Sequence, residues 1–152
     1  MNTFSEIINN SIIHVALIGW FFAQALKIPI NFLVERTWDF SRFYGSGGMP
    51  SSHSSMVVAT SLMIGTVQGF DSAVFALSVV ISSVVMYDAS GVRQEAGKQA
   101  AVINRIINDF IVEGKEFNTK ELKELVGHTN LEVLGGFIVG VLSWWLYIVF
   151  FY

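Results

Sequence analysis

A helix is predicted to begin within Gly47-Gly48-Met49-Pro50-Ser51-Ser52-His53-Ser54-Ser55, the stretch that separates a polar, aromatic segment from a long apolar run. The two glycines allow a tight turn, and Pro50 suits the first turn of a helix because its missing N–H would be unpaired there. Unpaired N–H groups and the helix dipole attract anions at such a start, and His53 beside an anion can give or take a proton. An ordinary N-cap at Ser51 or Ser52, with His53 incidental, explains the stretch equally well.

The composition is typical of a membrane protein. Of the 152 residues 53% are hydrophobic and 14% are charged, with a mean hydropathy of +0.55, whereas soluble domains carry about 25% charged residues. The absence of cysteine excludes disulfides and thiolate metal sites, and a net charge of −3 gives no reason to expect nucleic acid as a partner. The first apolar run lacks the features of a removable signal peptide, so we expect it to remain as a membrane helix. A bacterial plasma membrane is the simplest location.

Four apolar runs are long enough, or nearly so, to cross a bilayer, which needs about 20 residues of helix. We therefore predict an all-α, polytopic membrane helix bundle that forms a single integral membrane domain over residues 1–152, with spans at about 7–27, 53–69, 72–87 and 131–152. The second span is rich in Ser, Thr, Gly and Ala. Because small residues let membrane helices approach closely, this span should be central in the bundle.

The region 88–130 is the extended polar part of the chain. Apolar residues recur in it at helical spacing and predict an amphipathic helix from about Gly91 to Val112. Such a helix could lie on the membrane surface, cover the bundle or contact a second subunit, which leaves a homo-oligomer open. Asn118 with Glu121 resembles a capping box that opens a short helix through Val126.

The predicted topology collects polar residues on one face of the membrane. With four spans, alternation puts Lys27, His53, Asp88 and His128 on the same face, together with all nine Lys and Arg residues. The positive-inside rule makes that face cytoplasmic and puts both termini on the opposite side. Several cations serve only to set this orientation, but orientation does not explain two histidines at two helix starts on one face. That coincidence indicates a site.

The second informative stretch runs from Lys120 to Glu132. His128 and Glu132 are four residues apart, so they share one face of a helix. A carboxylate in this position can hold one imidazole nitrogen and leave the other free to attack. Thr129-x-x-Glu132 also reads as a capping box, and the two roles can coexist.

These two stretches resemble a known superfamily. The type-2 phosphatidic acid phosphatase and vanadium-dependent haloperoxidase superfamily carries the motifs P-S-G-H and S-R-x5-H-x3-D. This chain is similar in Pro50-Ser51-Ser52-His53 and in His128-x-x-x-Glu132 followed by Val133-Leu134-Gly135-Gly136. Three longer strings, residues 47–55, 87–93 and 122–136, resemble the small divergent branch often labelled acid phosphatase/vanadium-dependent haloperoxidase related. The resemblance covers most of the chain.

The resemblance implies roles for individual residues. In that superfamily a third-motif histidine attacks phosphorus, and the second-motif histidine protonates the leaving oxygen. Carried across, His128 is the nucleophile, Glu132 is its orienting partner and His53 is the general acid. Ser51 and Ser52 bind phosphate, and Lys27 best matches the lysine of the first motif, K-x6-R-P.

The chain departs from the superfamily's motifs in ways that bear on phosphate binding. Arg36 follows Lys27 by nine positions rather than seven, and no proline comes after it. Ser52 stands where the superfamily has glycine, although its hydroxyl could add a phosphate contact. Glutamate replaces aspartate at position 132, which lengthens the side chain by one methylene and need not abolish orientation.

The third-motif arginine has no match, because Glu121-Leu122 replaces the Ser-Arg pair. Arg93 is the preferred replacement, since it follows the third span on the predicted site face. Asp88 could orient Arg93 or could be a turn residue. Lys98 and Lys123 are the alternative sources of positive charge.

The resemblance implies hydrolysis of a lipid phosphate or diphosphate within the membrane, so an enzyme is favoured. No cofactor is expected, although vanadate or phosphate could occupy the pocket; a zinc site built from His53, His128 and Glu132 is a weaker alternative. The alternative function is a non-catalytic anionic-lipid-binding membrane protein that keeps the phosphate pocket, which the missing arginine supports. A haloperoxidase is a weaker interpretation that rests on the same vanadate-sized pocket.

Overall fold

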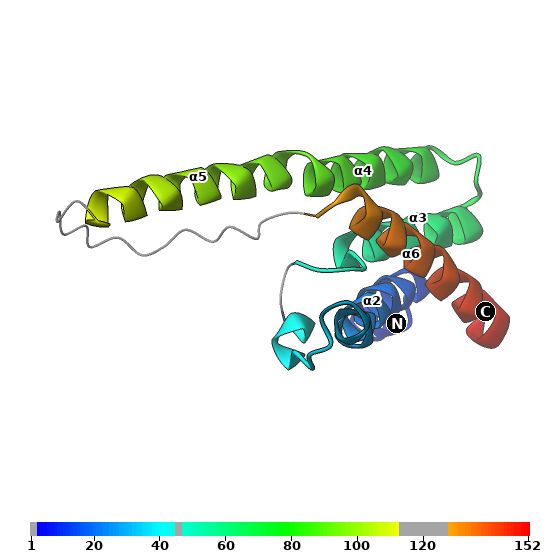
Figure 1. Cartoon of the computed structure of the whole chain (residues 1–152). Coiled ribbons are helices and arrows are strands. Elements are labelled where there is room, and N and C mark those ends of the chain that lie inside the picture. Colours follow the sequence, from blue (N-terminus) through cyan, green and yellow to red (C-terminus); the bar gives the residue numbers. More distant parts are fainter. Residues whose placement is uncertain (1–2, 45–46, 113–127) are drawn as a thin grey trace.

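A computed structural model describes residues 3–44, 47–112 and 128–152 of the chain. Within these ranges the chain forms helices and no strand: α1 (Thr3–Ile8), α2 (Ser11–Glu35), the 3-10 helix η1 (Phe40–Phe43), α3 (Ser52–Gln68), α4 (Ala73–Ser90), α5 (Val92–Val112) and α6 (Asn130–Phe151) (Figure 1). The predicted all-α membrane helix bundle is confirmed.

Three helical stretches in the described part of the chain are long and apolar enough to cross a membrane: Ser11–Glu35, Ala73–Ile107 and Asn130–Phe151. The 17-residue helix α3 is not among them, so the predicted count of four spans is not confirmed. This helix buries serine hydroxyls in the interior of the bundle, where the other helices shield it, which explains why it is less apolar than its neighbours.

Helix α3 is central, as predicted, and packs against α2, α4 and α6. Glycines on α6 allow its close approach. A Cβ atom added at Gly136 would collide with the Ser51 carbonyl oxygen, and one added at Gly140 would lie 2.6 Å from the carbonyl oxygen of Ser55. Small residues at helix contacts are the usual way in which membrane helices pack closely.

Side-chain hydrogen bonds also join α3 to its three neighbours. Ser55 Oγ donates to the Gly19 carbonyl of α2 (2.7 Å), the Ser61 and Ser82 hydroxyls lie 2.8 Å apart between α3 and α4, and Trp144 Nε1 of α6 donates to Thr66 Oγ1 (3.0 Å). Polar groups in a bilayer must find partners within the protein, so these bonds let a hydroxyl-rich helix occupy the interior.

The first helix differs from the predicted span 7–27 at both ends. Asn10 interrupts the helix, and its Oδ1 accepts the N–H of Ile12 at 3.0 Å, which caps the start of α2. Helix α2 then continues past Lys27 and through Pro29 to Glu35. A proline removes one backbone hydrogen bond, which this helix tolerates. An apolar run marks where the chain crosses the membrane, not where its helix ends.

The predicted amphipathic helix from about Gly91 to Val112 is present as α5. Gly91 caps α4, and α5 continues outward nearly in line with α4, beyond the other helices (Figure 1). The predicted capping box of Asn118 and Glu121, with its helix through Val126, lies outside the described residues.

The starts of α3 and α6 meet the junction of α4 and α5 at one end of the bundle (Figure 1). Two backbone hydrogen bonds hold these segments together: Ser51 N–H donates to the Glu132 carbonyl at 2.9 Å, and His128 N–H donates to the Ala89 carbonyl at 2.8 Å. The segments that were predicted to share one face of the membrane therefore lie at one end of the bundle.

Candidate functional site

The start of α3 combines a cap with free backbone donors. Ser51 is the N-cap, and its Oγ accepts the Ser54 N–H at 3.3 Å and the Ser54 hydroxyl at 3.0 Å. Pro50 was expected in the first turn of the helix, but it precedes the cap and so stands outside that turn. The N–H groups of Ser52 and His53 open the helix, and helical geometry gives them no acceptor within it. The Ser51 cap is therefore present, and it leaves two backbone donors without a partner in the helix.

The two predicted phosphate-binding serines have different surroundings. Ser51 is fully buried and its hydroxyl takes part in the cap. Ser52 is 3% exposed, and within the described residues its hydroxyl makes no hydrogen bond. The hydroxyl of Ser52 is thus the one that remains available for a ligand at this helix start.

His128 and Glu132 are in contact. His128 Nδ1 lies 3.1 Å from Glu132 Oε2, and the same oxygen accepts the Thr129 N–H at 2.8 Å. Thr129 Oγ1 accepts the Glu132 N–H at 3.3 Å, which completes a capping box at the start of α6. One carboxylate therefore caps the helix and holds the imidazole, so the two roles that the sequence left open coexist.

The contact with Glu132 decides which ring nitrogen of His128 is free. A carboxylate only accepts hydrogen bonds, so Nδ1 carries the proton that faces Glu132. Nε2 of the neutral ring then keeps its lone pair. His128 is 4% exposed, so its ring is held in a buried setting. This is the arrangement in which a histidine can act as a nucleophile.

Basic side chains from two other helices complete the group. Lys27 of α2 is 1% exposed, and Arg93 stands at the start of α5. The charges of Arg93, His128 and Lys27 act on His53, and those of His128 and Lys27 act on Glu132. Charge interactions are largely screened beyond about 10 Å at ordinary ionic strength, so Lys27 and His128 lie near both His53 and Glu132, and Arg93 lies near His53.

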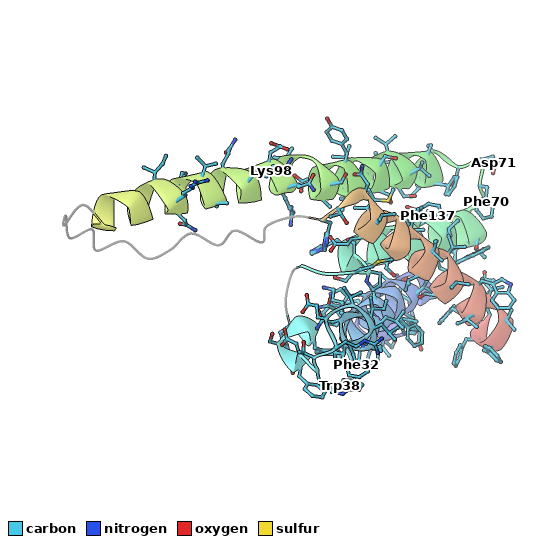
Figure 2. The ribbon with its side chains drawn as sticks, in the orientation of Figure 1. Phe32, Trp38, Phe70, Asp71, Lys98 and Phe137 are labelled. Atoms are coloured by element: carbon cyan, nitrogen blue, oxygen red, sulfur yellow. The ribbon has the colours of Figure 1, made fainter. Side chains whose placement is uncertain are left out.

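The remaining predicted residues are placed differently. Arg93 Nε donates to Asp88 Oδ2 at 2.6 Å, across the junction of α4 and α5. Lys98 pairs with Glu95 at 2.6 Å on the exposed surface of α5, in the part that extends beyond the bundle (Figure 2). Lys123 lies outside the described residues. Asp88 therefore contacts the preferred arginine, whereas Lys98 is engaged with a neighbour on its own helix.

One buried polar residue near this group was not predicted. Gln24 of α2 is 5% exposed, and its Nε2 donates to the Phe43 carbonyl of η1 at 2.7 Å. It precedes Lys27 by three residues, so the two side chains are neighbours on one face of the helix. That spacing is the signal that could have identified it.

The chemistry that the site can perform follows from its groups. It has one histidine held by a carboxylate, a second histidine at a helix start, two cations and free backbone donors. Among the described residues no group of three or more His, Cys, Asp or Glu side chains could hold a metal ion. Positive charge, N–H donors and two histidines at one end of the bundle suit an anion such as phosphate.

A curated relative supports the membrane location. The uncharacterized membrane protein YuiD of Bacillus subtilis (strain 168) is 42% identical to this chain over 147 residues, which cover 90% of this chain and 93% of that protein. No solved structure matches the chain. Together with the three apolar helices, the relative identifies the chain as a membrane protein. The sequence also matches the Divergent PAP2 family over residues 8–143, a range that includes all of the histidines and cations gathered at the site, and the chain belongs to that family.

Proposed function

We propose that this protein is a membrane-embedded phosphatase that hydrolyses a lipid phosphate or diphosphate through a phosphohistidine, without a metal or cofactor. The observation that carries the proposal is the contact between His128 Nδ1 and Glu132 Oε2, which leaves Nε2 of a buried imidazole as a free nucleophile. Membership of a PAP2-related family gives the proposal independent support.

In the first step His128 Nε2 attacks phosphorus, and the bond from phosphorus to the lipid oxygen breaks. His53, protonated, gives its proton to the leaving oxygen. The imidazole of His128 becomes positively charged as the N–P bond forms, and the Glu132 carboxylate stabilises that charge. In the second step water attacks the phosphohistidine, His53 takes a proton from the water, and phosphate leaves.

Charge stabilisation accounts for the rest of the site. Phosphoryl transfer depends mainly on positioning and on groups that stabilise the oxygens around phosphorus. The Lys27 ammonium, the Arg93 guanidinium and the N–H groups at the start of α3 supply positive charge and donors for those oxygens. Lys27 is buried in a membrane helix, and buried charges in membranes are usually functional.

A lipid substrate suits a site at the ends of membrane helices, because the phosphate of a lipid lies at the level of the headgroups. We further propose that this end faces the cytoplasm of a plasma membrane, since the positive-inside rule assigns the Lys- and Arg-rich side to the cytoplasm. The acyl chains would then remain in the bilayer while the phosphate enters the bundle end.

The test is phosphate release by the purified protein in nanodiscs, measured on a panel of lipid phosphates and diphosphates. We expect His128→Ala and His53→Ala each to abolish or greatly reduce release. His14→Ala is the matched control, because His14 is the third histidine of the chain and bonds instead to the Tyr147 hydroxyl and the Ile8 carbonyl. A wild-type protein that binds lipid phosphates but releases no phosphate would be the non-catalytic lipid-binding protein instead.

Two further measurements examine the mechanism itself. The trapped intermediate should be acid-labile and base-stable, as phosphohistidine is, and should be absent from His128→Ala. Release should persist in excess EDTA and be inhibited by orthovanadate, which mimics the five-coordinate phosphorus of the transition state. Activity that EDTA removes and a divalent cation restores would contradict a metal-independent reaction.

A further inference from the structure

Gln24 carries a buried oxygen that has no partner. Its amide nitrogen donates to the Phe43 carbonyl at 2.7 Å, and only the nitrogen of an amide can donate. Oε1 is therefore the atom that remains, and the whole residue is 5% exposed. Among the side-chain nitrogen and oxygen atoms of the described residues that are themselves fully shielded from solvent, this oxygen is the one without a hydrogen bond.

An unpaired acceptor inside a membrane helix calls for an explanation. Leaving such a group unsatisfied is costly, and buried polar atoms in native proteins nearly always find a donor. Gln24 stands on the same face of α2 as Lys27. The charge of Lys27 acts on both His53 and Glu132. The donor that completes Gln24 is thus expected next to the phosphate.

We propose that Gln24 is a specificity-determining residue of the phosphate site, whose Oε1 accepts a hydrogen bond from a hydroxyl on, or beside, the phosphorus of the bound ligand. The inference rests on the proposed function for the presence of phosphate. An acceptor favours ligands that bring a proton: the singly protonated phosphate of a monoester, or a headgroup with a free hydroxyl. An acceptor oxygen makes no hydrogen bond with a fully ionised anion, which has no proton to donate.

A comparison of phosphate with sulfate distinguishes a ligand that can donate a proton to Gln24 from one that cannot. The two ions have the same shape, but sulfate carries no proton near neutral pH, whereas inorganic phosphate still carries at least one. Binding of each ion to the protein in nanodiscs would be measured by calorimetry for the wild type and for Gln24→Met, which keeps the volume and removes the amide. We expect the preference for phosphate over sulfate to fall roughly tenfold, the effect of one hydrogen bond.

Phe21→Leu is the matched control. The Phe21 ring packs edge-on against Phe43 with centroids 6.1 Å apart, so this change loosens the same segment but leaves the Gln24 amide in place. A merely structural role for Gln24 would weaken the binding of both ions together, as Phe21→Leu should. A change in the phosphate-to-sulfate ratio is a readout that loss of structure does not produce.

A second comparison identifies the source of the hydroxyl. Short-chain phosphatidate has no free glycerol hydroxyl, whereas the corresponding lysophosphatidate has one. If Gln24→Met alters the ion ratio, the donor is the P–OH group; if it weakens only lysophosphatidate, the donor is the headgroup hydroxyl. If neither occurs, or if Phe21→Leu reproduces every effect, Gln24 has no recognition role.

Failure of this inference is distinguishable from failure of the proposed function. Lipid phosphate release by the wild type, lost in His128→Ala, alongside an unchanged ion ratio in Gln24→Met, overturns the role of Gln24 alone. A wild-type protein that binds neither ion and releases no phosphate overturns both.

Discussion

His128 and Glu132 are joined at a distance of 3.1 Å between Nδ1 and Oε2, and the oxygen that holds the imidazole is also the oxygen that accepts the Thr129 N–H. The nucleophile is therefore oriented by the start of the helix that follows it. Any movement of the α6 cap would turn the ring, so helix capping and the geometry of the nucleophile are coupled in this site.

Two substitutions can separate the capping of α6 from the orientation of the His128 imidazole. Glu132→Gln keeps an oxygen that can accept from Thr129 and from Nδ1 but removes the charge, so we expect phosphate release to fall by about 100-fold, in the range of acid–base contributions, with little change in stability. Thr129→Ala removes the cap hydroxyl and leaves the His128 contact, so it should cost about 1 kcal/mol of stability and keep most of the activity. Thermal unfolding and phosphate release on both variants check this. Equal losses of activity in the two would contradict an orienting role for the carboxylate charge.

The helix positions that could be predicted are those with local signals. The bounds of α3 and α6 lie close to the ranges 53–69 and 131–152, because serine and threonine caps stand immediately before each helix. The extent of α2 could not be predicted in this way, since hydropathy reports where lipid begins while backbone hydrogen bonds continue beyond it. The number of spans cannot be counted from hydropathy alone, because an interior helix such as α3 need not be apolar.

In the candidate site, too, the residues that could be predicted are those with a signal in the sequence. The pairing of His128 with Glu132 follows from a spacing of four residues, and the gathering of His53 and Lys27 at one end follows from alternating spans. For Gln24 the sequence offers only a three-residue spacing from Lys27, because its hydrogen-bond partner is the backbone carbonyl of Phe43, 19 residues away in a short 3-10 turn. A bond to a carbonyl leaves no pattern of side-chain types in the sequence.

Close packing of α6 on the start of α3 gives a second prediction. Gly136→Ala would push a methyl group into the Ser51 carbonyl and toward Ser54 Cβ, 2.8 Å away. We expect a loss of about 1–3 kcal/mol in stability from overpacking, and a loss of phosphate release because the cap of α3 must move. Thermal unfolding in one detergent measures the first effect.

The neighbouring glycine supplies the control for that prediction. A Cβ added at Gly135 would meet the end of the flexible Met49 side chain, at 3.1 Å from Cε, and that chain can move aside. Gly135→Ala should therefore unfold near the wild-type temperature. If both variants behave alike, the added helix propensity of alanine or a general effect on α6 is responsible, rather than contact with α3.

The Asp88–Arg93 pair leads to a third prediction. Under the proposed function Arg93 contacts phosphate and Asp88 holds it in position, so Arg93→Gln should raise KM roughly tenfold or more, as expected for a hydrogen bond to a charged group. Asp88→Asn should raise KM less, because the guanidinium remains. Steady-state kinetics on the best lipid substrate provide the measurement.

The ion pair of Lys98 with Glu95, which lies within α5, is the comparison for Arg93. Lys98 and Glu95 also lie 2.6 Å apart, but both side chains are more than half exposed, and such pairs contribute little. Glu95→Gln should leave KM and stability nearly unchanged. An effect of Glu95→Gln as large as that of Asp88→Asn would mean that the overall charge of α5, and not Arg93 in particular, governs binding.

The orientation of the bundle can be tested because the chain has no cysteine, so a single introduced thiol reports its own position. Tyr44 is 89% exposed directly after η1, and Asp71 is exposed in the turn between α3 and α4, at the end of α4 away from α5 (Figure 2). We expect an impermeant maleimide to label Asp71→Cys in intact cells and Tyr44→Cys only after permeabilisation. The reverse pattern would overturn the cytoplasmic assignment of the site.

The same experiment decides whether α3 crosses the membrane. Its 17 residues extend about 26 Å, slightly less than a hydrocarbon core of about 30 Å. Because α2, α4 and α6 pack against it, α3 contacts protein over most of its surface and needs neither the length nor the hydropathy of an isolated span. Labelling of Tyr44→Cys and Asp71→Cys from opposite sides is therefore the expected result. Labelling of both from one side would mean that α3 turns back within the membrane, and the bundle would then have three spans.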